Sequence, residues 1–225
     1  GYMLQQCLAN AFAASGVPAV VATVVTQVVV DAGDPAFAEP SKPVGEMIPP
    51  ERVDDLHALG WSLAEDRHRG GWRRVVPSPD PQEIVEAGAI RTLVDDGAVV
   101  IAAGGGGIPV VATETGLSGV AAVIDKDLAS ALLAIDLGAD ALLILTDVDR
   151  VRVGYGAPDE RPIDAMTIAE ARSLLDAGEF PPGSMGPKVE ALCRYVEATG
   201  KLGAIASIED GERALSGEAG SRVVP

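Results

Sequence analysis

The chain is poor in cysteine, histidine and aromatic residues. Its 225 residues include two cysteines, and neither Cys7 nor Cys193 lies in a CxxC or zinc-ligand spacing. The sequence therefore gives no sign of a disulfide framework or of a metal site made by protein side chains. Both thiols fall at apolar positions of expected helices, so we predict that they are buried. His57 and His68 have no partner at metal-ligand spacing and are expected on the surface.

Long apolar runs and an excess of basic residues are also missing. The most apolar stretch, residues 19–30, is interrupted by Thr23, Thr26 and Gln27 and is too short to cross a membrane. Residues 1–16 lack a basic leader, so no signal peptide is recognised and a cytoplasmic location is expected. The formal net charge of -16 argues against a nucleic acid or an anionic membrane as a partner.

Lysine is scarce. The seventeen basic residues are thirteen arginines and only four lysines, Lys42, Lys126, Lys188 and Lys201. The first three lie in glycine- and proline-punctuated or doubly acidic contexts, which favours a functional use of the compact, mobile ammonium group near phosphate. Chance placement of so few residues is the alternative interpretation.

The apolar residues that are present predict a mainly parallel α/β sheet sandwiched by helices. Two short apolar runs, residues 98–103 and 141–145, indicate buried strands, and residues 127–137 between them indicate a helix, which together make a β-α-β unit. Residues 19–30 are rich in β-branched side chains and predict one central strand. Further helices are expected at residues 3–12, 86–96, 167–177, 188–198 and 210–215, and further strands at 203–208 and 221–224. Strand and helix alternate with few hairpins, as in parallel sheets.

A small inserted lid is predicted within this core. Five prolines break any regular element over residues 35–50, and residues 50–59 then indicate a helix that ends at Gly60. Residues 61–64 and 72–76 flank a polar turn and predict a β-hairpin. We therefore expect a lid of residues 35–80 inserted in an α/β core of residues 1–34 and 81–225.

Four consecutive glycines follow the first strand of the β-α-β unit. Ligands of open α/β sheets bind beyond the carboxyl ends of the strands, and Gly104, Gly105, Gly106 and Gly107 occupy such a place. Their unshielded amides can cradle an anion, although a simple flexible turn is the alternative. The dinucleotide fingerprint fails because Pro109 takes its sixth position, and no Walker A string occurs.

A lysine lies between two aspartates where a loop becomes the helix at residues 127–137. The ammonium of Lys126 can face a transferring phosphoryl group while Asp127 holds it by a charge-assisted hydrogen bond. The simpler interpretation is a helix start, for which Asp125 is a suitable N-cap. Both interpretations can hold at once.

Two further strings have alternative interpretations. Thr146-Asp147-Val148-Asp149 follows a strand and can line a nucleotide pocket, or it can be an Asx turn. Lys188 ends the string Gly183-Ser-Met-Gly-Pro-Lys at a second loop-to-helix junction. Met185 within it can cover a flat base or fill a gap in the core.

Seven strings together resemble the carbamate kinases of the amino acid kinase family, and they run in order through nearly the whole chain. They are Thr26-Gln-Val-Val-Val-Asp31, Ser41-Lys-Pro-Val-Gly45, Gly71-Trp-Arg-Arg-Val-Val-Pro-Ser-Pro79, Gly104-Gly-Gly-Gly-Ile-Pro109, Val123-Ile-Asp-Lys-Asp127, Thr146-Asp-Val-Asp149 and Gly183-Ser-Met-Gly-Pro-Lys188.

The resemblance implies reversible phosphoryl transfer from carbamoyl phosphate to ADP, which gives ATP and carbamate. It further implies Mg²⁺ held mainly by the nucleotide phosphates, a homodimer and a part in arginine metabolism. By the same resemblance, Lys126 and Lys188 neutralise the transferring group, Asp127 orients them and Lys42 reaches down from the lid. The residues implied to bind the nucleotide are Thr146, Asp147, Val148, Met185, Gly186 and Pro187, and those implied to bind the substrate are Gly104, Gly105, Gly106 and Gly107.

Two strings of the family are missing. Its members begin with a strand that ends in a Gly-Gly-Asn loop and later carry a His-Gly-Asn-Gly-Pro-Gln loop, and neither string occurs here. The chain opens instead on a helix that follows both loops in the family. We therefore expect an N-terminally truncated kinase. Three functions compete, namely an active carbamate kinase, an inactive remnant that still binds ADP, and another acid or nucleotide kinase of the same superfamily.

Overall fold

The computed structural model describes residues 1–66, 70–180 and 183–225, and its strands fall into several small sheets. In the first part of the core, β2 (Gln27–Val29) pairs in parallel with β8 (Ile108–Thr113) and antiparallel with β6 (Glu83–Ile84). Strand β8 continues into a hairpin with β9 (Gly116–Gly119). Beside this sheet, β1 (Val21–Thr23) pairs in parallel with β7 (Val99–Ile101).

The second part of the core is a sheet of the order β10-β14-β15-β13. Strand β10 (Ala141–Thr146) lies parallel to β14 (Leu202–Ser207), and β15 (Ser221–Val224) lies antiparallel to β14 and parallel to β13 (Ala165–Thr167). A separate antiparallel pair is formed by β11 (Val151–Val153) and β12 (Arg161–Ile163).

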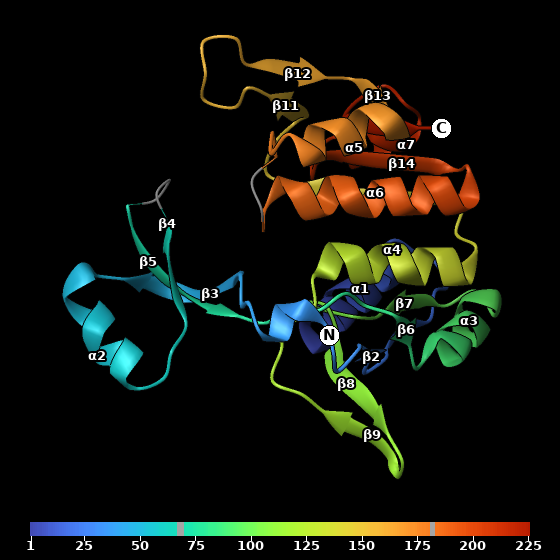
Figure 1. Cartoon of the computed structure of the whole chain (residues 1–225). Helices are drawn as coiled ribbons and strands as arrows, with labels where there is room; N and C mark the ends of the chain where they lie inside the picture. Colours follow the sequence, from blue (N-terminus) through green and yellow to red (C-terminus); the bar gives the residue numbers. More distant parts are fainter. Residues whose placement is uncertain (67–69, 181–182) are drawn as a thin grey trace.

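Helix α4 (Lys126–Leu137) is shared by both hydrophobic clusters of the core. Ala131 and Ala134 pack in the cluster under the second sheet, whereas Ala129 packs in the cluster around β2. Figure 1 shows α4 between α6 (Met185–Thr199) and the first part of the core. The remaining core helices are α1 (Tyr2–Ala14), α3 (Ala87–Asp95), α5 (Ile168–Asp176) and α7 (Gly211–Leu215).

A three-stranded antiparallel sheet extends away from this core (Figure 1). Its order is β3 (Lys42–Ile48), β5 (Gly71–Val76) and β4 (Leu63–Asp66). The single turns η1 (Pro35–Phe37) and η2 (Pro50–Arg52) flank β3, and α2 (Val53–Ala58) follows η2. We call these elements from β3 to β5 the lid. The predicted helix over residues 50–59 and the predicted strand pair are both present, whereas the turn residues 67–69, with His68, lie outside the described residues.

The strand predicted over residues 19–30 is wrong as a single element. The chain leaves β7 after the amide of Val24 donates to Ile101, and it joins β8 by the time that Val30 donates to Val110. Between the two strands the hydroxyl of Thr26 donates to the carbonyl of Val24 and accepts from the amide of Ala103. These bonds hold a bend that divides the run into β1 and β2.

Two other predicted elements need correction. Strand β3 forms inside the proline-rich segment because Pro43 lies on an edge strand, where a missing amide is tolerated. The predicted β-α-β unit is not one sheet, since β7 and β10 belong to different sheets among the described residues. Helix α6 begins at Met185, three residues before the predicted start.

The two cysteines differ in their environments. Cys193 is buried as predicted, and burial raises the pKa of its thiol to about 11. The prediction for Cys7 is wrong, because α1 buries none of its residues in this structure and the thiol is exposed. His57 is exposed as expected.

The four consecutive glycines at residues 104–107, which we call the glycine loop, pack directly onto the start of α4. Gly106 has a φ of 135°, and a Cβ there would lie 2.2 Å from the carbonyl oxygen of Ile124. Because Ile124 immediately precedes Asp125, this close approach of two backbones fixes the loop beside the helix N-terminus.

We expect Gly106→Ala to lower the free energy of unfolding by about 3 kcal/mol, because it adds both strain and a backbone clash. Gly105→Ala is the matched control, since a Cβ there meets no atom within 4 Å and the residue has no positive φ. Urea unfolding of both variants measures the difference. Equal losses would show that the loop is not fixed by this contact.

Candidate active site

Two ammonium groups share one carboxylate at the start of α4. Oδ1 of Asp127 accepts a hydrogen bond from Nζ of Lys126 at 2.7 Å, and Oδ2 accepts one from Nζ of Lys188 at 2.8 Å. Asp127 is buried, and Lys188 lies in the first turn of α6. The structure therefore brings together, from two helices, the three residues predicted to surround the transferring group.

Local sequence explains why α4 begins where it does. Oδ1 of Asp125 accepts from the backbone amides of Asp127 at 2.9 Å and Leu128 at 3.3 Å, which is an N-cap. Asp127 in the first turn is further favoured by the helix dipole. Since α4 and α6 pack against each other and Lys188 reaches Asp127, the N-termini of both helices meet at this site.

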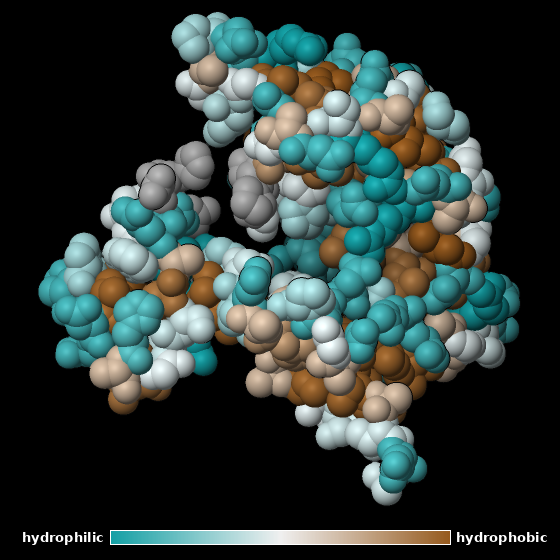
Figure 2. Space-filling view, viewed as in Figure 1, coloured by the Kyte–Doolittle hydropathy of each residue, from teal (hydrophilic) through white to brown (hydrophobic). Residues whose placement is uncertain are grey.

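The lid supplies a third ammonium group to the same place. Lys42, the first residue of β3, forms an ion pair with Oδ2 of Asp125. The two oxygens of Asp125 therefore serve different partners, one the backbone of α4 and the other the lid. Figure 2 shows a recess between the lid and the end of the core formed by α6.

Asp125 is a site residue that sequence reasoning missed. Its local sequence indicates an N-cap, and this role uses one of its oxygens. Its second partner, Lys42, lies 83 residues earlier in the chain, so no local signal could reveal the contact.

Charge on the neighbouring groups shifts two pKa values in this cluster. Burial by itself raises the pKa of Asp125, but the hydrogen bond and charge of Lys42 and the two backbone amides outweigh it, so the pKa lies below its ordinary value. Burial likewise lowers the pKa of Lys126, and the bond to Asp127 outweighs it, so this pKa is raised. Both groups are therefore charged near neutral pH.

The two lysines on Asp127 differ in how open they are to a ligand. The side chain of Lys126 is 53% exposed, whereas that of Lys188 is 12% exposed. Each ammonium has three donors and uses one of them on Asp127. Lys126 therefore has donors on the solvent side for an incoming anion. With three lysines and two aspartates, the cluster carries one excess positive charge in an acidic chain.

Three of the four predicted substrate glycines, Gly104, Gly105 and Gly107, line a hollow of about 390 Å³ at the ends of β1 and β7. Gly104 and Gly105 are exposed, Gly107 is partly exposed, and Gly106 is buried against Ile124. The amides of Gly104 and Gly106 donate to the carbonyls of Ala102 and Ala103 inside the loop. Because these two amides already donate hydrogen bonds within the loop, a bound anion would have to accept its hydrogen bonds mainly from other groups of the loop.

The predicted nucleotide residues lie on two elements. Thr146 ends β10 and donates to Asp147 at 3.0 Å, and Val148 follows. Met185, Gly186 and Pro187 precede Lys188 in the first turn of α6, and Met185 packs partly against the core. We call Lys42, Lys126, Lys188, Asp125 and Asp127 the lysine cluster. Within the described part of the chain, none of the predicted nucleotide residues forms an ion pair with a member of this cluster.

The fourth lysine has a different environment. Lys201 donates to the carbonyls of Gly138 at 2.7 Å and Ala139 at 3.0 Å, just after the end of α4. This contact stabilises a helix C-terminus, where a positive charge is favourable.

Comparison with known proteins identifies the family. The model of the amino acid kinase family matches residues 2–207. A carbamate kinase of Thermococcus kodakarensis is 49% identical over the whole of this chain and 71% of its own length. The structure of carbamate kinase from Giardia lamblia bound to citric acid aligns with a TM-score of 0.91 and 45% identity, and that bound to AMP-PNP with 0.87 and 46%. Both alignments cover all of this chain and 71% of the Giardia chain.

The chain therefore belongs to the amino acid kinase family, a family of phosphoryl-transferring enzymes with an α/β fold. Within that family it groups with the carbamate kinases. The resemblance and the fold class predicted from the sequence are confirmed. None of the helices in the described parts has both the length and the apolar character that crossing a bilayer requires.

Substitution of Asp125 separates its two tasks. Asparagine caps helices about as well as aspartate but carries no charge for Lys42, whereas alanine does neither. We expect Asp125→Ala to lose about 1 kcal/mol more unfolding free energy than Asp125→Asn. In a double-mutant cycle measured by urea unfolding, Asp125→Asn and Lys42→Gln should be non-additive. Additive losses would mean that the ion pair contributes nothing.

Stability should also depend on pH through Asp125. Its pKa in the folded chain lies below the ordinary value of 3.8, so its contribution is complete above that value and disappears as the pH falls through the folded-state pKa. The gap in unfolding free energy between wild type and Asp125→Asn should be constant above about pH 5 and should shrink on acidification. A gap that widens in acid would contradict this assignment.

Proposed function

We propose that this protein catalyses reversible phosphoryl transfer from carbamoyl phosphate to ADP, giving ATP and carbamate. The observation that carries the proposal is the pairing of Lys126 and Lys188 on the single carboxylate of Asp127 where two helix N-termini meet. Phosphoryl transfer needs positioning and stabilisation of spread negative charge rather than a covalent nucleophile. A cluster of fixed ammonium groups meets that requirement.

Asp127 sets the spacing of the two lysines. Because each of its oxygens binds one ammonium, the remaining donors of Lys126 and Lys188 can contact oxygens of one phosphoryl group from two sides. Negative charge that develops on these oxygens during transfer is then stabilised by groups that are already in place. In this proposal Lys126 and Lys188 are catalytic and Asp127 is the residue that positions them.

Lys42 acts from the lid. Its ammonium already lies within the cluster, paired with Asp125, and β3 connects it to the rest of the lid sheet. With substrate present, the same ammonium can turn its free donors toward the carbamoyl phosphate. Closure of the lid would then bring this positive charge onto the substrate and exclude water.

The nucleotide is proposed to lie on the opposite side of Lys188. Thr146, Asp147 and Val148 would border the adenosine together with Met185, Gly186 and Pro187. The binding of AMP-PNP by the Giardia lamblia enzyme supports a nucleotide in a chain of this fold. Gly104, Gly105, Gly106 and Gly107 would lie at the acceptor end, beside the hollow at β1 and β7.

Mg²⁺ is proposed to enter with the nucleotide. Among the described residues no group of three or more His, Cys, Asp or Glu side chains is arranged to hold a metal ion. Asp125 is paired with Lys42, and Asp127 is paired with both Lys126 and Lys188. This arrangement supports an ion held mainly by phosphate oxygens, where it would neutralise part of their charge.

The setting of the reaction is proposed on the same basis. We infer a cytoplasmic homodimer that acts in arginine metabolism, with small anionic substrates and no nucleic acid or membrane partner. The net charge of -16 supports the exclusion of polyanionic partners.

A second candidate is a protein that binds ADP without turnover. It is favoured by the absence of Gly-Gly-Asn and His-Gly-Asn-Gly-Pro-Gln strings from these 225 residues. ATP formation from carbamoyl phosphate and ADP, measured beside calorimetric ADP binding, separates the two candidates. Phosphorylation of acetylglutamate or UMP instead would contradict both.

Lysine substitutions test the proposed roles. We expect Lys126→Gln and Lys188→Gln each to lower the kcat for ATP formation by about 10²- to 10³-fold, because each removes charge aimed at the transferring group. Lys201→Gln is the control, since it removes the same charge away from the site and should keep kcat within about twofold. Similar losses in all three variants would indicate a general effect of charge.

Removal of the metal ion tests the proposal that Mg²⁺ is held mainly by the nucleotide and not by the protein. Excess EDTA should abolish ATP formation, and added Mg²⁺ should restore it, while the melting temperature of the nucleotide-free protein should not change. A fall in that melting temperature on chelation would instead indicate a metal site built by the protein itself.

A further inference from the structure

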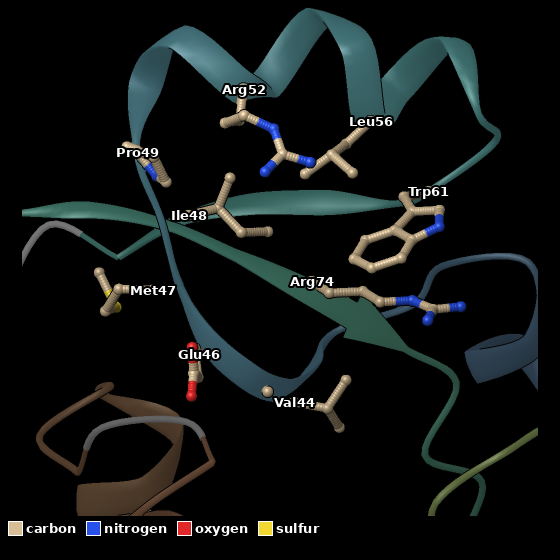
Figure 3. A pocket seen from close by; sticks show the side chains of 10 residues that line it. Val44, Glu46, Met47, Ile48, Pro49, Arg52, Leu56, Trp61 and Arg74 are labelled. Atoms are coloured by element: carbon tan, nitrogen blue, oxygen red, sulfur yellow. The ribbon is translucent and has the colours of Figure 1, made fainter.

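The lid contains a hollow that is separate from the lysine cluster. It has a volume of about 400 Å³ and is lined by residues of β3, by Arg52 and Leu56 from the helical segment, and by Trp61 and Arg74. None of the five residues of the lysine cluster lines it. Figure 3 shows Ile48, Arg52, Leu56 and Trp61 turned toward one shared space. Its volume is in the range of sites for small organic ligands.

Apolar groups and one aromatic ring form the walls. Leu56 is buried, and Ile48 and Trp61 are partly exposed. The guanidinium carbon of Arg74 lies 4.3 Å from the centre of the Trp61 ring, so a cation-π contact holds both side chains. The hollow therefore offers a ligand the hydrocarbon surface of Leu56 and Ile48 beside a Trp61 ring that is held by Arg74.

The charge at this hollow is unusual for the chain. Two guanidinium groups line it against one carboxylate, Glu46, whose side chain lies away from Arg52 and Trp61 in Figure 3. Within residues 1–66, 70–180 and 183–225, neither Arg52 nor Arg74 forms an ion pair. In a protein of net charge -16, an unpaired guanidinium over an apolar wall selects anions.

We propose that this hollow binds a small organic anion in which a carboxylate is attached to an aromatic body. The guanidinium of Arg52 binds the carboxylate through paired hydrogen bonds, and the ring of the ligand packs between Leu56, Ile48 and Trp61. The ligand needs both its carboxylate and its aromatic ring, because Arg52 binds the charge and the apolar wall binds the ring.

Nuclear magnetic resonance offers a direct test, because the chain contains only two tryptophans and hence two indole N–H signals. Trp61 lines the hollow and Trp72 does not. Titration with para-chlorobenzoate should shift the Trp61 signal in a saturable way and leave the Trp72 signal nearly unchanged. The Trp72→Phe variant assigns the two signals. Equal shifts in both signals, or none, would overturn the proposal.

Three controls test the chemistry. The neutral para-chlorobenzamide, which lacks the charge, and acetate, which lacks the ring, should each bind about tenfold more weakly. Arg52→Gln should weaken para-chlorobenzoate binding by about the same factor. Arg213→Gln, which removes an equal charge from α7 in the core, should leave it unchanged. Equal binding of the amide, or equal losses in the two arginine variants, would contradict a charge-selective site.

Discussion

The shared carboxylate of Asp127 is the interaction on which the rest of the site depends. It joins the first turns of α4 and α6 at the place where charge is concentrated, and α4 itself packs in both hydrophobic clusters. Two ammonium groups at such short range repel each other unless a carboxylate lies between them. The burial of Asp127 makes this arrangement rigid, and rigidity is what electrostatic stabilisation of a transferring group requires.

A second carboxylate extends the same logic to the lid. Asp125 begins α4 with one oxygen and binds Lys42 with the other, so the helix start and the lid contact share one side chain. Strand β3 carries Lys42 at its first residue and lines the lid hollow with its later residues. A change at Lys42 and a change at the lid hollow therefore both involve the same strand, β3.

The sequence predicted the α/β class and the central site residues because their signals are local. Lys126 and Asp127 are adjacent, and Lys188 stands at a loop-to-helix junction like that of Lys126. Three features were not predictable, because each depends on distant partners. The division of residues 19–30 arises from bonds to β7 and β8, the strand containing Pro43 depends on its place at a sheet edge, and Asp125 needs Lys42.

The scarcity of lysine has a practical consequence for chemistry on this protein. Three of its four ε-amino groups lie in one cluster, and the fourth is bound to carbonyl groups beyond the end of α4. A reagent that modifies primary amines would therefore act on few side chains, and the most exposed amine of the cluster belongs to Lys126. Isotopic labelling of lysine alone would likewise yield a spectrum of four side chains, most of them reporting directly on the occupancy of one pocket.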